Sequence, residues 1–392
     1  MIRVLTISRI NLSSGRTHVY NLTKTTSALN SREELEVDLV STDKPTNTST
    51  FLKKFNIGKD KRFNLILLNS FSKKLENKNR ILGWMAIFFA NFSIIKFTFL
   101  NNTKYDVIYL RDETLFMSVM FLKIILRKKV FYEVHSVLER PHGQMMNKVI
   151  AKLSDGIIAI SSELKKYYEQ YNSNIIMSLC SSYEEGWFDY SKDKKTFREE
   201  LGLPEDSILI GYTGVLGANP NNDYYEIDDI VKSLKKLPEN VIFVGVGELN
   251  NNADWIRRVA KENLVTDRVI IKPWQDRSVI PKFLQSFDIS VIPKRKKDLI
   301  GDSPAKMFPA IASKVPIVAG NSESITDVLV DGRNAVIVRE NNKDGWAEAI
   351  NKILEDKEFA DKITQQAFED KELYTWEKRA EAISSFVSKA SI

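Results

Sequence analysis

The sequence has 392 residues, of which 43% are hydrophobic and 28% are charged, and this is the composition of a globular chain long enough for two domains with a core each. Its single cysteine, Cys180, excludes a disulfide framework within the chain and is typical of a reducing compartment. The first ten residues already follow a strand pattern, so we expect no signal peptide and a cytoplasmic protein, at the inner face of the membrane if it contacts one.

The net charge of +6 is unevenly distributed along the chain. Residues 1–186 carry 27 lysine and arginine residues against 17 aspartate and glutamate residues, a balance of +10, whereas the rest carries 30 against 34, a balance of −4. The basic half predicts an anionic partner, either a phosphorylated acceptor or an acidic membrane surface, although solvated lysines explain it equally well. The basic residues are not interleaved with aromatic residues in any recognisable module, which disfavours nucleic-acid binding.

Short apolar runs alternate with helical patterns through the whole chain. In the first half we predict strands at 2–8, 35–41, 64–69, 106–110, 129–134 and 156–160, and helices at 17–30, 83–100, 114–126, 144–153 and 162–171. In the second half we predict strands at 207–212, 240–245, 268–272, 288–292, 315–319 and 335–338, and helices at 225–236, 253–263, 278–285, 304–313, 323–330 and 343–355. Such alternation is typical of parallel sheets with helices on both faces.

We therefore predict an α/β protein with two doubly wound, Rossmann-like domains facing a central cleft. The predicted N-terminal domain covers residues 1–186 and the C-terminal domain covers residues 187–373, with a linker at 181–203. In such folds ligands bind at the carboxyl ends of the strands, so we look for functional residues there.

The apolar segment Ile81–Leu100 is long enough for a membrane span but contains Asn91, Ser93 and Lys96. A buried-strand pattern at 105–110 follows it at once. We interpret the segment as a crossover helix packed on a sheet, with an exposed apolar edge suited to peripheral membrane contact, and a true span is the less favoured alternative.

Residues 291–320 predict a strand, a charged loop, a helix and a second strand. Ser303 is a natural N-cap and Pro304 suits the first helical position, so we predict that the helix begins there. Free N–H groups at this end, with Lys306 one turn in, would form an anion site suited to phosphate. A plain crossover with solvated lysines is the alternative.

The ordered set of motifs in the second half resembles that of GT-B glycosyltransferases of the family 4 type, the glycosyl transferases group 1. The resemblance is carried by the strand and glycine turn at 209–217, the strand and Gly-x-Gly turn at 241–248, and the segments 269–274, 279–293 and 303–308. It implies donor binding by Gly214, Val215, Leu216, Gly217, Gly245, Gly247, Pro273, Trp274, Lys294, Arg295, Ser303, Pro304, Ala305 and Lys306. It also implies that a final helix, residues 374–392, crosses back to the N-terminal domain.

In the first half, the turn after the opening strand is similar to the family's glycine loop on the acceptor side. The resemblance implies acceptor contacts from Ser14, Gly15, Arg16 and His18, and the alternative is an ordinary strand-to-helix turn with a solvated arginine.

His135 follows a strand at the position of the family's histidine beside the anomeric carbon of the donor, which implies that it holds the transferred sugar. Arg111 and Asp112 follow the neighbouring strand and point to the same cleft. We consider Asp112 and Glu139 as carboxylates that orient the acceptor hydroxyl, with Arg111 beside them.

Two positions depart from the family pattern. Family members usually carry two glutamates eight positions apart, and these positions hold Gly301, or the adjacent Asp302, and Pro309. Pro309 offers no side-chain hydrogen bond, and inside a helix we expect it to force a kink. Asp302, placed to reach the sugar from the loop, favours an active enzyme.

The resemblance implies a retaining transfer in which the acceptor attacks the face that the nucleotide leaves. The sequence contains no Asp-x-Asp pair and no His/Cys cluster with zinc spacing, so it requires neither a metal nor a cofactor beyond a nucleotide-sugar co-substrate, a UDP- or GDP-sugar being favoured. The expected acceptor is a surface polysaccharide or a glycolipid. The alternatives are a degenerate homologue that acts as a partner subunit or sugar-nucleotide binder, and a sugar-nucleotide epimerase, for which no clear acid/base pair is present.

Overall fold

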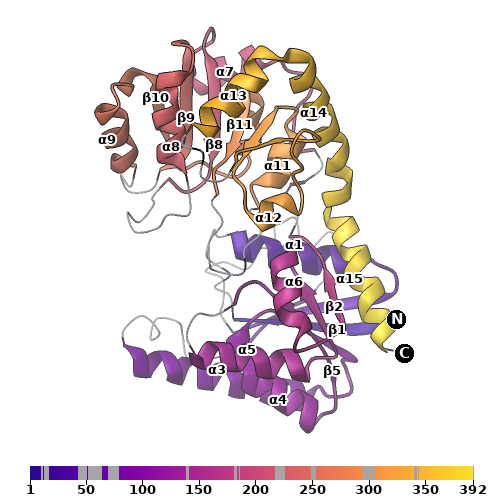
Figure 1. Ribbon diagram of the computed structural model, residues 1–392. Coiled ribbons are helices and arrows are strands. Elements are labelled where there is room, and N and C mark those ends of the chain that lie inside the picture. Colours follow the sequence, from indigo (N-terminus) through magenta and orange to yellow (C-terminus); the bar gives the residue numbers. More distant parts are fainter. Residues whose placement is uncertain are drawn as a thin grey trace. The chain divides into compact units, whose positions relative to one another are not determined.

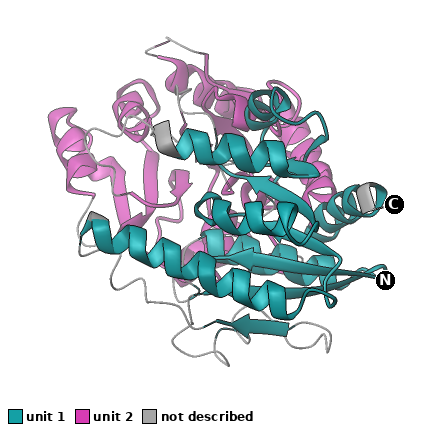
Figure 2. Ribbon diagram, turned by 90° about the horizontal axis from the view of Figure 1, so that it is seen from below, with its two compact units in different colours: residues 1–181, 299–303, 376–392 teal, residues 182–298, 304–375 magenta. Residues whose placement is uncertain are grey.

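The computed structural model describes residues 1–9, 12, 17–42, 51, 64–68, 79–137, 141–180, 183–184, 186–216, 226–248, 253–294, 301, 305–339, 342 and 344–391. The chain divides into two compact units, drawn in different colours in Figure 2. Unit 1 comprises Met1–Ser181, Leu299–Ser303 and Trp376–Ile392, and unit 2 comprises Ser182–Asp298 and Pro304–Thr375. The last helix of the chain therefore belongs to the same unit as its first strand.

Unit 1 is built on a seven-stranded sheet in the order β3-β2-β1-β4-β5-β6-β7, in which every neighbouring pair is parallel. The strands are β1 Ile2–Ser8, β2 Leu35–Ser41, β3 Asn64–Leu67, β4 Val107–Leu110, β5 Lys129–Val134, β6 Gly156–Ala159 and β7 Ile175–Met177. The strand order reverses between β1 and β4, and ligands bind at such switch points in doubly wound sheets.

Helices cover both faces of this sheet (Figure 1). They are α1 Thr17–Asn30, α3 Arg80–Leu100, η1 Glu113–Leu115, α4 Phe116–Ile124, α5 Pro141–Leu153, α6 Ser162–Glu169 and α15 Trp376–Ser391. One apolar core joins the sheet to α3, α4, α5 and α6, and a second core on the other face joins it to α1 and α15. The final helix thus packs beside α1 on the sheet of unit 1.

Unit 2 repeats the architecture with a six-stranded parallel sheet in the order β10-β9-β8-β11-β12-β13. Its strands are β8 Ile208–Thr213, β9 Val241–Glu248, β10 Val269–Pro273, β11 Ile289–Ile292, β12 Ile317–Ala319 and β13 Val336–Ile337. Its helices are α7 Lys194–Leu201, α8 Ile227–Ser233, η2 Leu234–Lys236, α9 Asp254–Glu262, η3 Thr266–Arg268, α10 Ile280–Ser286, α11 Met307–Ala312, α12 Glu323–Thr326, α13 Gly345–Glu355, α14 Lys357–Asp370 and η4 Lys371–Tyr374. The switch point of this sheet lies between β8 and β11, so Gly214 and Lys294 follow the two strands that flank it.

The structure corrects the sequence predictions at several elements. Helix α7 lies inside the predicted linker at 181–203, where the Asp193 side chain caps it by accepting a hydrogen bond from the Thr196 N–H at 2.9 Å. The sequence of α7 is mostly polar and charged, so the pattern of apolar residues did not indicate a helix there. Strand β7 also has no predicted counterpart, because a three-residue strand is too short to show a period. Helix α14 was not predicted either.

The helix predicted at 304–313 is shorter than expected. Helix α11 begins at Met307 with Lys306 at the N-cap position and no side-chain cap, which is later than the predicted start, and Ser303 and Pro304 lie outside the described residues. Pro309 is the third residue of α11, where its N–H would have no acceptor within the helix, so the expected loss of a helical hydrogen bond and the kink it would force do not apply.

Among the described residues, one helix is long and apolar enough to cross a membrane, at Ile81–Leu100 in α3. Asn79 caps this helix by accepting from the Leu82 N–H at 2.9 Å, and 28% of the apolar window is buried inside the molecule. Helix α3 packs against α4 as the crossover between β3 and β4, in agreement with the interpretation of the sequence.

Candidate active site

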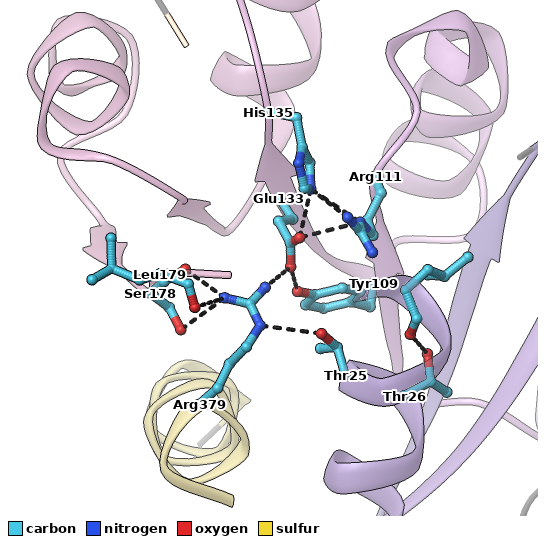
Figure 3. A network of polar contacts seen from close by, with 10 residues as sticks. Thr25, Thr26, Tyr109, Arg111, Glu133, His135, Ser178, Leu179 and Arg379 are labelled. Carbon is cyan, nitrogen blue, oxygen red and sulfur yellow. Dashed lines mark hydrogen bonds and ion pairs between the residues drawn. The ribbon is translucent and has the colours of Figure 1, made fainter. Parts of the chain in front are cut away.

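In unit 1, the candidate functional side chains at the carboxyl ends of β4 and β5 contact one buried carboxylate (Figure 3). Glu133, near the end of β5, is fully buried, and its Oε1 lies 3.1 Å from Nε of Arg111 and 2.6 Å from Nε2 of His135. Its Oε2 accepts a hydrogen bond from the Tyr109 hydroxyl and lies 2.6 Å from Nη2 of Arg379 on α15.

The charges of this cluster are fixed by their neighbours. Burial opposes ionisation of Glu133, but the Arg111 and Arg379 guanidinium groups outweigh it and hold the pKa of this carboxyl well below its usual range. Burial raises the pKa of the Tyr109 phenol, and the Glu133 carboxylate raises it further, so this hydroxyl stays protonated and donates. One carboxylate and two guanidinium groups leave a net positive charge in the cluster.

His135 is therefore neutral. Burial, followed by the Arg111 charge, lowers the pKa of its imidazole to about 4. Its ring lies edge to face against the His18 ring at the start of α1, with the ring centroids 6.3 Å apart. A neutral imidazole held in this way orients a ligand by hydrogen bonding rather than attacking it.

Arg111 has donors beyond those that the cluster uses. Its Nη2 lies 2.7 Å from Nε2 of His135, whereas its buried Nη1 has no hydrogen-bond partner among the described residues. An unsatisfied buried donor costs about 1–3 kcal/mol, so a ligand oxygen or a water at this position would be stabilising.

Asp112 and Glu113 begin the short helix η1 that follows β4. Oδ1 of Asp112 caps this helix by accepting from the Thr114 N–H at 2.9 Å, and Nη1 of Arg9 donates to the Thr114 hydroxyl at 2.7 Å. Burial, followed by the Asp112 charge, raises the pKa of Glu113 to about 7. Asp112 thus holds the loop as well as being a candidate for acceptor orientation, and Glu113 is a second carboxyl beside it.

Gly301 occupies a place that admits no side chain. A Cβ atom there would lie 2.6 Å from Cα of Ser136 and 2.9 Å from the carbonyl oxygen of His135, and the backbone has φ of +116°. The backbone of residue 301 thus contacts the strand end that carries the histidine, and a glutamate with this backbone would overlap Ser136.

In unit 2, two glycines bring the ends of β8 and β9 together. A Cβ atom on Gly247, whose φ is +130°, would lie 2.1 Å from the carbonyl oxygen of Gly214. Gly214 itself has φ of +154° and donates its N–H to the carbonyl of Val246 at 2.9 Å. The chain then continues to Val215, which is 55% exposed, and to the buried Leu216. Only glycine allows this close approach of the two strand ends at the switch point.

The side chain of Lys306 lies over this glycine turn. Its Nζ is 2.8 Å from the Tyr212 hydroxyl and 4.6 Å from the centre of the same ring, and it would be 3.2 Å from a Cβ on Gly214. Burial raises the pKa of Tyr212, so the phenol is neutral and leaves the ammonium charge uncompensated by it. A lysine beside a glycine turn at the end of a strand is suited to a phosphate group.

The remaining predicted donor residues divide into two groups. Trp274, which follows Pro273 at the end of β10, donates its backbone N–H to the Glu248 carbonyl at 2.8 Å. The residue is 51% exposed, so its ring is available to stack on a ligand. Lys294 is instead buried, with Nζ 2.6 Å from the Ser324 hydroxyl.

Gly245 lies within β9, where a Cβ would be 3.1 Å from a methyl group of Leu216, and Ala305 precedes Lys306. Several predicted site residues lie outside the described residues, namely Ser14, Gly15, Arg16, Glu139, Gly217, Arg295, Asp302, Ser303 and Pro304.

Three candidate metal ligands lie near one another in unit 1. Ligand atoms of Glu133, His135 and Cys180 all lie within 4.8 Å of each other. Both carboxylate oxygens of Glu133 already contact cationic guanidinium groups, and two such charges oppose a bound cation. This donor set fits an ion-pair cluster better than a metal site.

Three residues of these clusters were not predicted from the sequence: Glu133, Arg379 and Tyr212. Glu133 had a signal, because a carboxylate inside the apolar run of β5 must be buried and paired. Arg379 had none, since its partner lies 246 residues away in the chain.

Residues 193–370 match the family described as glycosyl transferases group 1. A D-inositol 3-phosphate glycosyltransferase of Xylanimonas cellulosilytica is 25% identical over 201 residues, which is 50% of this chain and 46% of that protein. An uncharacterized glycosyltransferase of Methanocaldococcus jannaschii is 23% identical over 76% of this chain and 79% of that protein. The chain thus spans about half the length of the inositol phosphate relative.

Solved structures show the same fold over the whole chain. Sucrose-phosphate synthase from Thermosynechococcus elongatus has a TM-score of 0.77 at 16% identity, covering 99% of both chains. HepE of Anabaena in complex with UDP has a TM-score of 0.73 at 16% identity, covering 99% of this chain and 100% of that chain. The two doubly wound sheets therefore form a GT-B fold.

Proposed function

The chain carries a glycosyl transferases group 1 domain at residues 193–370, and from this premise we propose a retaining glycosyltransferase that moves a sugar, such as a hexose, from a UDP- or GDP-sugar to a polysaccharide or glycolipid acceptor. The observation that carries the proposal is the contact of Gly214, Gly247 and Lys306 at the switch point of unit 2. A glycine turn at the switch point with a lysine beside it suits the charge of a donor diphosphate.

The leaving nucleotide develops negative charge as the bond to the sugar breaks, and this charge must be neutralised. Lys306 carries that role in our proposal, held in place by the Tyr212 hydroxyl at 2.8 Å. Trp274, half exposed at the end of β10, is the candidate for stacking on the base. The mechanism is proposed to be independent of metal, so turnover persists when divalent cations are chelated.

His135 is proposed to hold the transferred sugar, and Arg111 to contribute its buried Nη1 donor to the same ligand. Because His135 is neutral, it accepts or donates one hydrogen bond to a sugar hydroxyl without placing a further charge beside the departing nucleotide. The acceptor hydroxyl attacks from the face that the nucleotide leaves, and its proton passes to the departing phosphate. Asp112 is proposed to orient that hydroxyl.

One observation favours a second candidate, a degenerate homologue that binds sugar nucleotide without turnover. Gly301, where the family usually carries a glutamate, leaves no space for a side chain. If no other carboxylate serves this position, binding would persist and catalysis would be lost.

The experiment that tests the proposal is a donor panel of UDP-, GDP-, ADP- and CMP-sugars, read by thermal shift and by release of free nucleotide. An active transferase is stabilised by one donor and releases its nucleotide slowly, and proton NMR of the product shows the anomeric configuration of the donor. Stabilisation without release, with membrane extract supplied as acceptor, supports the degenerate homologue. Lys261→Ala, at an exposed lysine of α9 in the same unit, is the matched control for Lys306→Ala.

A further inference from the structure

Helix α3 presents its large apolar side chains to solvent. Its exposed positions recur every three to four residues and, apart from Lys96, are all apolar: Ile81, Trp84, Met85, Phe88, Phe92, Phe99 and Leu100. Its fully buried positions hold smaller or polar side chains, namely Ala86, Ala90, Asn91, Ile94 and Thr98. A core-facing helix of a water-soluble unit shows the opposite distribution.

The inner face of α3 is satisfied without the exposed side chains. Nδ2 of Asn91 donates to the Thr114 carbonyl at 2.9 Å, and its Oδ1 accepts from the Ser118 N–H at 2.9 Å. Thr98 donates to the carbonyl of Ile94, four residues earlier in the same helix, at 2.8 Å. The bonds of Asn91 fix α3 to η1 and α4, and the Thr98 hydroxyl is satisfied within α3, so this packing does not require the aromatic side chains on the outer face.

The apolar surface continues onto the next helix. Helix α4 packs beside α3, and its Met120 and Ile124 are exposed, as is Ile125 directly after it. Figure 1 shows the two helices on the same side of unit 1. We name the exposed side chains of α3, together with Met120, Ile124 and Ile125, the α3–α4 apolar face.

Basic residues border this face. Lys96 is exposed on α3 itself, and Arg127 and Lys129 are exposed immediately after Ile125. The first 186 residues carry a charge balance of +10, which complements an anionic surface. Aromatic and aliphatic side chains with lysine and arginine at the edge are the features of a helix that lies in the plane of a lipid interface.

We propose that the α3–α4 apolar face docks on an anionic lipid bilayer, with α3 lying flat in the interface. A membrane-spanning orientation is incompatible with the hydrogen bonds of Asn91, which tie the middle of α3 to η1 and α4 of unit 1. The bilayer is the occupant that matches both the apolar stripe, in which Lys96 is the one charged exposed residue of α3 described, and the basic residues that follow Ile125. The inference rests on the proposed function only for the purpose of the docking, which is to bring the enzyme to a lipid-linked acceptor.

The test is flotation of the full chain with vesicles of phosphatidylcholine and with vesicles that contain an equal share of phosphatidylglycerol. The protein binds the anionic vesicles, and added salt weakens the binding. Phe88→Gln with Phe92→Gln weakens vesicle partitioning by about a hundredfold, or about tenfold for each ring. Leu373→Gln, at an exposed leucine of unit 2, changes nothing.

A labelled chain makes the test independent of the double variant. An environment-sensitive dye on Phe92→Cys shifts to the blue with anionic vesicles and is quenched by brominated lipid, whereas the dye on Leu373→Cys is not; the native Cys180 is buried. Failure of the wild type to bind anionic vesicles overturns the proposal. So does full binding by the double variant, or its conversion of a wild-type dimer to a monomer, which would assign the face to a second copy. No assay here uses a nucleotide sugar, so failure is distinguishable from failure of the proposed function.

Discussion

Arg379 and Glu133, 246 residues apart in the chain, form a fully buried ion pair with Nη2 2.6 Å from Oε2. Arg379 also donates to the Leu179 carbonyl at 2.9 Å and to the Thr25 hydroxyl at 3.1 Å. The same carboxylate contacts His135, so the last helix of the chain is coupled through one side chain to the candidate sugar-binding histidine.

Replacing Arg379 with Met removes one partner of the buried pair and leaves Glu133 with a single guanidinium group. We expect a loss of about 3–5 kcal/mol in the free energy of unfolding, because a buried charge left underpaired is strongly destabilising. Urea unfolding measures it. Lys378→Met, at the exposed neighbour on α15, is the control with little effect, and an equally small effect of Arg379→Met would contradict the role of the pair.

The sequence predicts the elements that carry the candidate site better than it predicts the ion pair of Arg379 and Glu133. Both sheets and the strand ends that carry Arg111 and His135 are predicted from local periodicity, and the glycine turns are predicted from the family resemblance. The pairing of Arg379 with Glu133 depends on where a distant helix packs, and no local pattern encodes that. The start of α11 at Met307 differs from the predicted start for a similar reason, since a local helix-start signal is a preference that tertiary packing can override.

The stability of the protein should fall between about pH 6.5 and pH 4 in a manner that depends on His135. Its folded-state pKa of about 4 lies below the unfolded value of 6.5, so the unfolded chain binds the extra proton first. The contribution of His135 to the free energy of unfolding is complete above pH 6.5 and is lost as the pH falls toward 4. His135→Asn should flatten this part of a plot of unfolding free energy against pH, and an unchanged slope would show that the imidazole is not held neutral.

The contribution of Glu113 to stability should depend on pH in the opposite direction. Its folded-state pKa of about 7 lies above the model-peptide value, so its contribution is present at low pH and is lost as the pH rises through 7. Glu113→Gln, which keeps the shape without the charge, should raise the melting temperature at pH 8 and leave it unchanged at pH 4. Glu377→Gln on α15 should change it at neither pH, and a Glu113→Gln variant that behaves in the same way would contradict the burial of this carboxyl.

Gly301→Ala should destabilise unit 1 by about 1–3 kcal/mol, because the new methyl group meets Ser136 and the backbone has a positive φ. Gly301→Glu, which restores the usual family residue, should impair turnover rather than improve it, since the strain falls on the segment that follows His135. Differential scanning calorimetry and the nucleotide-release assay check the two expectations. A gain of activity in Gly301→Glu would mean that the glycine is a lost carboxylate rather than a packing requirement.

Lys306→Ala should weaken binding of the cognate nucleotide diphosphate by about tenfold to a hundredfold, the usual strength of a hydrogen bond to a charged group. Titration calorimetry with UDP and GDP measures this, and Lys261→Ala should retain wild-type affinity. Equal affinity in both variants would place the diphosphate away from the glycine turn of β8.

The central claim is that the protein transfers sugar from a nucleotide donor held at Gly214, Gly247 and Lys306. The most direct measurement is the steady-state release of nucleotide from the donor that stabilises the wild type, compared among the wild type, Lys306→Ala and His135→Ala. The account predicts release by the wild type, slowed by about a hundredfold in each variant. No release by the wild type from any donor, with membrane extract present, or equal release by all three proteins, would contradict it.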